Sequence, residues 1–155
     1  MTTEVKVIGL VIFATFIILV GGVFLLSKGG KAVPESEVVT RNGLHWHPKL
    51  SIYIKGKKQE IPPNVGIGAV EQSIHTHEDN KEGIIHMEMQ GVVAKDETRL
   101  GNFFRIWGKQ FNSNCIFDKC NGPEGTVKMT VNGKDNNDFD NYKMRDGDNI
   151  EIKYE

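Results

Sequence analysis

Five histidines lie between positions 45 and 86 of this 155-residue chain, and the rest of the sequence has none. They form two His-x-His pairs and one His-x-Glu pair: His45/His47, His75/His77 and His86/Glu88. Side chains at i and i+2 of an extended segment point to the same side, so each pair can offer two donors to one ion. Imidazole is the commonest protein ligand of transition metals and suits both zinc and copper(II). The pattern therefore predicts a site for a copper or zinc ion.

The neighbouring residues favour this arrangement. Pro48 disfavours helical geometry at His47 and so favours an extended first pair. His86 and Glu88 share one strand face, opposite two methionines that we expect to point inward, which disfavours a methionine-rich copper(I) site. The predicted metal ligands are His45, His47, His75, His77, His86 and Glu88.

Three uses of such a cluster stay open. The favoured one is non-catalytic: a metal-binding module for delivery or buffering of the ion, or an accessory subunit of a membrane complex. The first alternative is a metal-dependent enzyme, in which three imidazoles leave one coordination position for water and Glu78, Glu82 or Glu88 is the general base. The second is a structural or interaction subunit of a membrane complex, with solvated histidines and no metal.

The elements that must position these residues form an α+β domain over residues 44–155. Residues 64–83 carry glycines and polar residues and are predicted to form a long loop. Apolar residues at helical spacing from Leu100 to Phe111, with Thr98 as N-cap, predict one helix packed on a mixed sheet. Alternating apolar residues and turn residues predict strands at 50–54, 58–61, 84–89, 127–131 and 150–154. The C-terminal sequence YKMRDGDNIEIKY resembles the last turn and strand of β-grasp domains, which makes a β-grasp-like fold a hypothesis.

The N-terminal residues predict a membrane anchor. Residues 7–26 contain no charged residue, and a 20-residue helix rises about 30 Å, which matches the hydrocarbon core of a bilayer. We therefore expect a single-pass transmembrane anchor at 1–27 and a polar tether at 28–43; a cleaved signal peptide is the alternative. Lysines flank both ends of the apolar run, so the positive-inside rule does not decide the orientation.

Cys115 and Cys120 indicate on which side of the membrane the domain lies. In an oxidising compartment such a pair forms a disulfide, while metal-binding thiolates or free thiols are the alternatives. A disulfide favours an oxidising compartment, so we expect the domain to lie outside the cytoplasm, at the cell membrane. The net charge is −1, without the basic excess typical of nucleic-acid binding, so no nucleic-acid partner is expected.

The histidine segments also resemble a family. It is a set of largely uncharacterised exported or membrane-anchored proteins of bacteria and archaea, and the segments are HWHPKLSIYIKG, EIPPNVGIG, HTHEDN, GIIHMEM and LGNFFRIWG. The stretch CIFDKCNGPEG…MTVNG is most similar to members from ammonia-oxidising archaea, whose exported chemistry is rich in copper. This sequence departs from the His-Thr-His-Asp motif that is usual in the family. Glu78 follows the second histidine, and Asp79 comes one residue later. The resemblance implies an exported or anchored protein and supplies no activity.

Overall fold

The computed structural model describes residues 3–26, 32–78 and 82–155, with the side chains of 3–6 and 24–26 left undescribed. The chain divides into two compact units, Met1–Val33 and Pro34–Glu155, and each is considered by itself.

The first unit contains one helix, α1 (Thr3–Leu26), which includes the whole predicted apolar run. Every valine, leucine, isoleucine and phenylalanine side chain from Val7 to Val23 is exposed. Within the described residues, no helix combines the length and the apolarity that a membrane crossing requires. The anchor at 1–27 stays a prediction.

The second unit begins earlier than the sequence predicts. A 3-10 turn at Glu35–Glu37 leads into β1 (Val38–Thr40), which pairs antiparallel with β7 (Val93–Ala94). Part of the predicted tether is therefore a strand of the domain, as its Val-Val-Thr sequence allows, because β-branched residues suit paired strands. Residues 28–31 of that tether lie outside the described residues.

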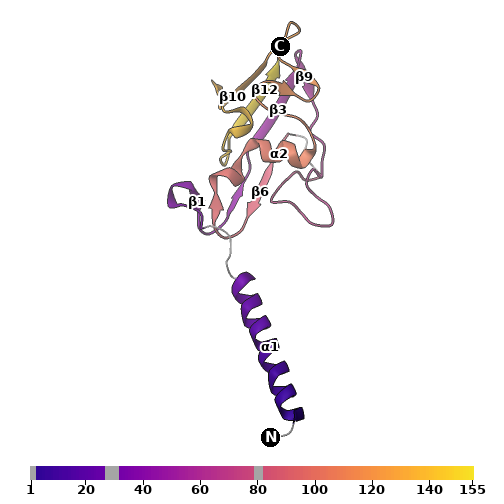
Figure 1. Ribbon diagram of the computed structural model, residues 1–155. Coiled ribbons are helices and arrows are strands. Elements are labelled where there is room, and N and C mark those ends of the chain that lie inside the picture. The colour runs from indigo at the N-terminus through magenta and orange to yellow at the C-terminus, as the bar shows by residue number, and fades with distance from the viewer. Residues whose placement is uncertain (1–2, 27–31, 79–81) are drawn as a thin grey trace. The chain divides into compact units, whose positions relative to one another are not determined.

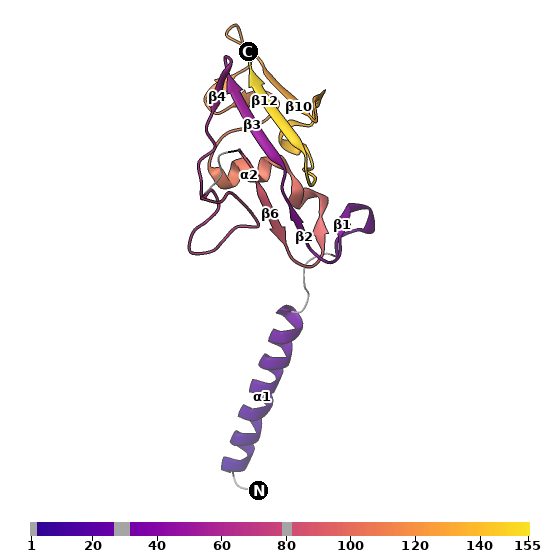
Figure 2. The same ribbon diagram turned by 180° about the vertical axis from the view of Figure 1, so that it is seen from behind.

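The larger sheet is mixed, as predicted. Its central strands β3 and β12 run parallel, with Leu50 beside Ile150 and Ile52 beside Ile152, and these four side chains are buried. Figure 2 shows the two strands side by side. In spatial order the strands are β11 (Lys134–Asp135), β10 (Val127–Val131), β12 (Asn149–Tyr154), β3 (Lys49–Ile54) and β4 (Lys57–Gln59). The α+β prediction is thereby confirmed.

A smaller antiparallel sheet carries the histidines. Its order is β2 (Leu44–Trp46), β6 (His86–Met89) and β5 (Ile74–His75). The prediction of a continuous loop over 64–83 was wrong at β5, because a two-residue strand between polar residues is too short to show an alternating pattern.

Two hydrogen bonds connect the lead-in to β6 with the start of β3. The Leu50 amide donates to the Gly83 carbonyl at 2.8 Å, and the Ile85 amide donates to the Pro48 carbonyl at 2.9 Å. Since Pro48 directly follows the first histidine pair, the same contacts place β2 beside β6.

The predicted helix is α2 (Leu100–Trp107), preceded by the 3-10 segment η2 (Lys95–Thr98). Its apolar side is buried at Leu100, Phe103 and Phe104. Figures 1 and 2, which look from opposite sides, show α2 on one face of β3.

Both ends of α2 differ from the prediction. Arg99 is the N-cap residue, while the Thr98 hydroxyl donates to the Lys95 carbonyl at 2.9 Å. Gly108, with φ +71°, ends the helix before Phe111, because glycine adopts the left-handed conformation without strain. Phe111 still packs on the helix, with its ring 4.5 Å from that of Phe104.

Cys115 and Cys120 form a disulfide between β8 (Cys115–Ile116) and β9 (Lys119–Cys120). The disulfide prediction is confirmed, and the thiolate-ligand and free-thiol alternatives are excluded. The remaining 3-10 turn, η3 (Phe139–Asn141), lies between β11 and β12.

A substitution at Gly83 tests the contact between β3 and the lead-in to β6. It has φ +76°, and a Cβ there would lie 2.1 Å from the Leu50 carbonyl oxygen. Gly133 has φ +76° as well, but a Cβ there would meet no atom within 4 Å. Gly83→Ala should therefore lower the free energy of unfolding by at least about 2 kcal/mol more than Gly133→Ala, measured by urea denaturation of the full-length chain. Equal losses in the two variants would contradict the role given to this close approach.

Candidate metal centre

The register of the small sheet brings the histidines together. His75 is paired with His86 across β5 and β6, and His45 is paired with Glu88 across β2 and β6. Because side chains alternate along a strand, Met87 and Met89 lie on the other face, where both are buried. The prediction that these methionines point inward is confirmed.

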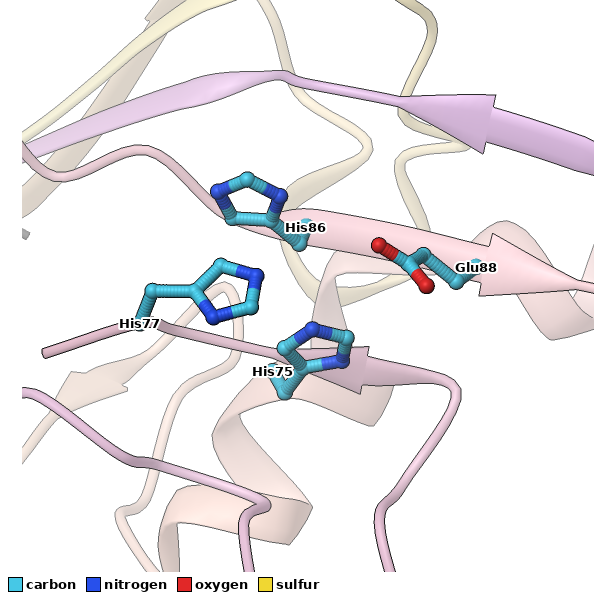
Figure 3. A group of neighbouring side chains, drawn as sticks. All are labelled: His75, His77, His86 and Glu88. Atoms are coloured by element: carbon cyan, nitrogen blue, oxygen red, sulfur yellow. The ribbon is translucent and has the colours of Figure 1, made fainter.

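Four of the predicted ligands form what we call the inner group: His75, His77, His86 and Glu88. One potential ligand atom from each lies within 4.8 Å of the others. The ring centre of His77 is 4.1 Å from that of His86 and 4.9 Å from that of His75. Figure 3 shows the three rings gathered between β5 and β6, with the Glu88 carboxylate beside them.

The outer group consists of His45, His47 and His86, whose potential ligand atoms also lie within 4.8 Å of one another. The ring centre of His47 is 4.6 Å from that of His45 and 4.8 Å from that of His86. His86 thus belongs to both groups. Each of the six predicted ligands belongs to at least one.

His75 has a defined tautomer. Its Nδ1 lies 2.9 Å from the Gln72 carbonyl oxygen, which can only accept a hydrogen bond, so Nδ1 carries the proton. In the neutral ring, Nε2 then presents a lone pair, which is the arrangement that metal-binding histidines use.

That Nε2 atom is buried and has no hydrogen-bond partner among the described residues. The Glu71 carboxylate lies only 3.2 Å from it, but not in hydrogen-bonding alignment. In the neutral ring this lone pair faces a carboxylate, so two acceptors meet without a donor. The Glu71 side chain is 56% exposed and can bind water, but the imidazole nitrogen is buried, and buried polar atoms in native proteins are rarely left without a partner. A cation bound there would satisfy the buried nitrogen.

His86 repeats the pattern. Its Nδ1 is also buried and without a hydrogen-bond partner among the described residues. Burial lowers the pKa of His86 below its usual value, and the nearby His77, His47 and His75 lower it further. These surroundings favour the neutral ring, which is the form that binds metal ions.

Carboxylates contact the two exposed histidines of the outer group, one at the ring and the other at the backbone. Glu88 Oε1 lies 3.1 Å from His45 Nε2, and Asp146 Oδ1 accepts a hydrogen bond of 2.8 Å from the His47 backbone amide. Asp146 and Glu71 were not predicted. Asp146 is 99 residues from His47, and Glu71 comes before a strand that the sequence did not reveal, so no local pattern identifies either residue.

The other two carboxylates considered as general bases lie outside both groups. Glu82 pairs with Lys49 at 2.8 Å, and that hydrogen bond lowers the pKa of the carboxyl group. Glu78 lines a separate cavity beside Leu50 and Pro63. Asp79 lies outside the described residues.

A polar groove of about 520 Å³ opens beside the two groups. Its lining includes His45, Glu71, His75 and Glu88. A small molecule or hydrated ion in this groove would therefore reach both the exposed and the buried imidazoles.

Comparison of the chain with protein-family models, with curated proteins and with solved structures finds no match. Function is therefore inferred from the side chains of the chain itself.

His86 should titrate at a lower pH than an ordinary histidine in the metal-free protein. Because its pKa is lower in the folded chain than in the unfolded one, His86 favours folding above the usual imidazole range of about pH 6.5. That contribution is lost as the pH falls through the folded pKa. Nuclear magnetic resonance of the ring nitrogens across a pH series would measure the pKa of His86. A His86 midpoint at or above the ordinary value would contradict the prediction.

Proposed function

We propose that this protein binds a copper or zinc ion through the histidine face of its small sheet. The observation that carries the proposal is the buried His75 Nε2, whose lone pair has no hydrogen-bond partner among the described residues and lies beside two more imidazoles and a carboxylate. Hydrogen bonding of its Nδ1 to the Gln72 carbonyl supplies the support that a metal-binding histidine usually has.

The dimensions suit such an ion. Ligands bound tetrahedrally at about 2.0–2.1 Å lie about 3.3 Å apart, so the inner group, spread over at most 4.8 Å, needs side-chain closure of about 1.5 Å. Three neutral nitrogens and one carboxylate suit zinc and copper(II). Met87 and Met89, buried on the opposite face, offer no thioether to this site.

The inner group supplies four donors by itself, and a closed four-ligand set favours holding an ion over catalysis. We therefore infer delivery or buffering of the ion, alone or as an accessory subunit of a membrane complex. The groove beside His45 and Glu88 favours a second candidate, a metal-dependent enzyme in which the outer group of three imidazoles leaves a position for water.

We also propose where the protein acts. The uncharged run at 7–26 and the exposed apolar side chains of α1 support attachment to a lipid bilayer, and the disulfide supports a domain outside the cytoplasm. The resemblance to exported histidine-motif proteins of archaea and bacteria agrees with this placement.

The strand order of the larger sheet supports the β-grasp-like assignment. An N-terminal hairpin (β3 and β4), a helix, a second hairpin (β10 and β11) and a last strand (β12) follow in sequence, with β3 and β12 parallel at the centre. This is the arrangement that the β-grasp hypothesis requires.

Removing two inner donors tests the metal site. His75→Ala with His77→Ala should weaken binding of zinc(II) and copper(II) to the full-length chain by more than about 100-fold, since even loss of an outer-shell partner costs about 10–100-fold. Isothermal titration calorimetry measures the affinity. The control is Lys57→Ala with Lys58→Ala, two exposed residues of β4, which should bind as the unaltered chain does.

Because His75 is buried, His77→Ala with Glu88→Ala gives a second test through two exposed residues. Unchanged affinity in both inner-group variants would contradict the proposal.

A single introduced thiol tests the location. Both native cysteines are in the disulfide, so Ser36→Cys creates the one free thiol of the chain. A membrane-impermeant maleimide should label it in intact cells, because the exposed Ser36 would lie outside the membrane. Labelling only after lysis would reverse the topology, and recovery of the chain in the soluble fraction would contradict membrane attachment.

A further inference from the structure

The histidine face carries more donors than one ion uses. A zinc or copper ion usually takes at most four protein ligands at about 2.0–2.1 Å, so donors on opposite sides of one ion lie at most about 4.2 Å apart. The six candidate ligands instead form two groups, each spread over up to 4.8 Å, and His86 is the member common to both. A single ion therefore leaves at least two of the six donors unused.

The small sheet separates the two groups by its strand spacing. His45 and His47 lie on β2 and directly after it, His75 and His77 lie on β5 and shortly after it, and β6 runs between these strands. Neighbouring strands lie about 4.8 Å apart, so an ion between β2 and β6 would be about 5 Å from an ion between β6 and β5. Known two-metal sites hold their ions about 3.5–4 Å apart, so this sheet can hold two ions without closer contact than proteins tolerate.

The donors divide between two ions without a shared ligand. When His86 binds the outer ion with its two outer-group partners, the inner ion keeps two imidazoles and Glu88. Three protein ligands and a water molecule are an ordinary donor set for zinc. The groove lined by His45, His75 and Glu88 gives water access to donors of both ions.

Carboxylates offset the repulsion between two divalent ions. Glu88 Oε1 lies 3.1 Å from His45 Nε2, and Asp146 Oδ1 lies 3.9 Å from His47 Nδ1. Glu71 Oε1 lies 3.2 Å from Nε2 of the buried inner imidazole. Negative charge therefore lies beside both groups, where it attracts a cation to each.

We infer that the histidine face holds two zinc(II) or copper(II) ions at once, one in the inner group and one in the outer group, with His86 as the third ligand of the outer ion. This inference rests on the proposed metal-binding function and extends it from a single ion to an adjacent pair.

The number of bound ions tests the inference. Calorimetric titration of the full-length chain with copper(II) should give two ions per chain. His45→Ala with His47→Ala should reduce the number to one, and so should His77→Ala with Glu88→Ala, because each double variant removes donors of one ion. All four altered side chains are exposed, so neither variant disturbs the core.

The matched control is Lys57→Ala with Lys58→Ala, on β4 of the larger sheet, which should still bind two ions. Electron paramagnetic resonance then shows whether the ions are neighbours. Each copper(II) ion carries one unpaired electron, so two ions about one strand spacing apart should give the half-field signal of a coupled pair. The control should keep this signal, and the two histidine-face variants should lack it.

One ion per chain in the unaltered protein would overturn this inference and leave the proposed function standing. Two ions without the half-field signal would also overturn it, as would a histidine-face variant that binds two ions or none. If the unaltered chain binds no zinc(II) or copper(II), the proposed function itself fails, and this inference fails with it.

Discussion

The register of β6 is the constraint on which the site and the core both depend. One face of this strand sends Met87 and Met89 into the core, and the other presents His86 and Glu88. Because side chains alternate with a period of two, a slip of one residue would exchange the two faces. The core would then receive an imidazole and a carboxylate, so burial of the methionines stabilises the register that builds the site.

The same site works against the stability of the metal-free fold. Buried polar atoms without partners cost free energy, and neither His75 Nε2 nor His86 Nδ1 has a hydrogen-bond partner in the part of the chain that the structure describes. Proteins depart from full satisfaction of buried polar groups mainly where function requires it. An ion that binds only the folded chain would add its binding free energy to folding. Its inner-group ligands come from β5, the residues that follow it, and β6, so it would also connect these two strands.

Much of this arrangement could be predicted from local patterns. The i, i+2 spacing of the histidines, the shared face of His86 and Glu88 and the apolar spacing of α2 each reflect a period that a few residues reveal. The contributions of β5, Glu71 and Asp146 could not be predicted, because they depend on contacts between distant segments. The strand in the predicted tether was missed for the same reason, since Val38–Thr40 is a strand only through its pairing with β7. The end of α2 shows a different failure: Phe111 fits the helical spacing, but Gly108 ends the helix first.

The number of donors argues for two positions. A zinc or copper ion bound at about 2.0–2.1 Å is usually surrounded by four protein ligands at most, while five imidazoles and Glu88 gather here. A site built only to hold one ion would need neither His45 nor His47. Of the six predicted ligands only His75 is buried, while His77 and Glu88 of the inner group are exposed, as His45 and His47 are. The surplus donors therefore do not close the site; they extend it along the face of the small sheet, on the other side of the shared His86.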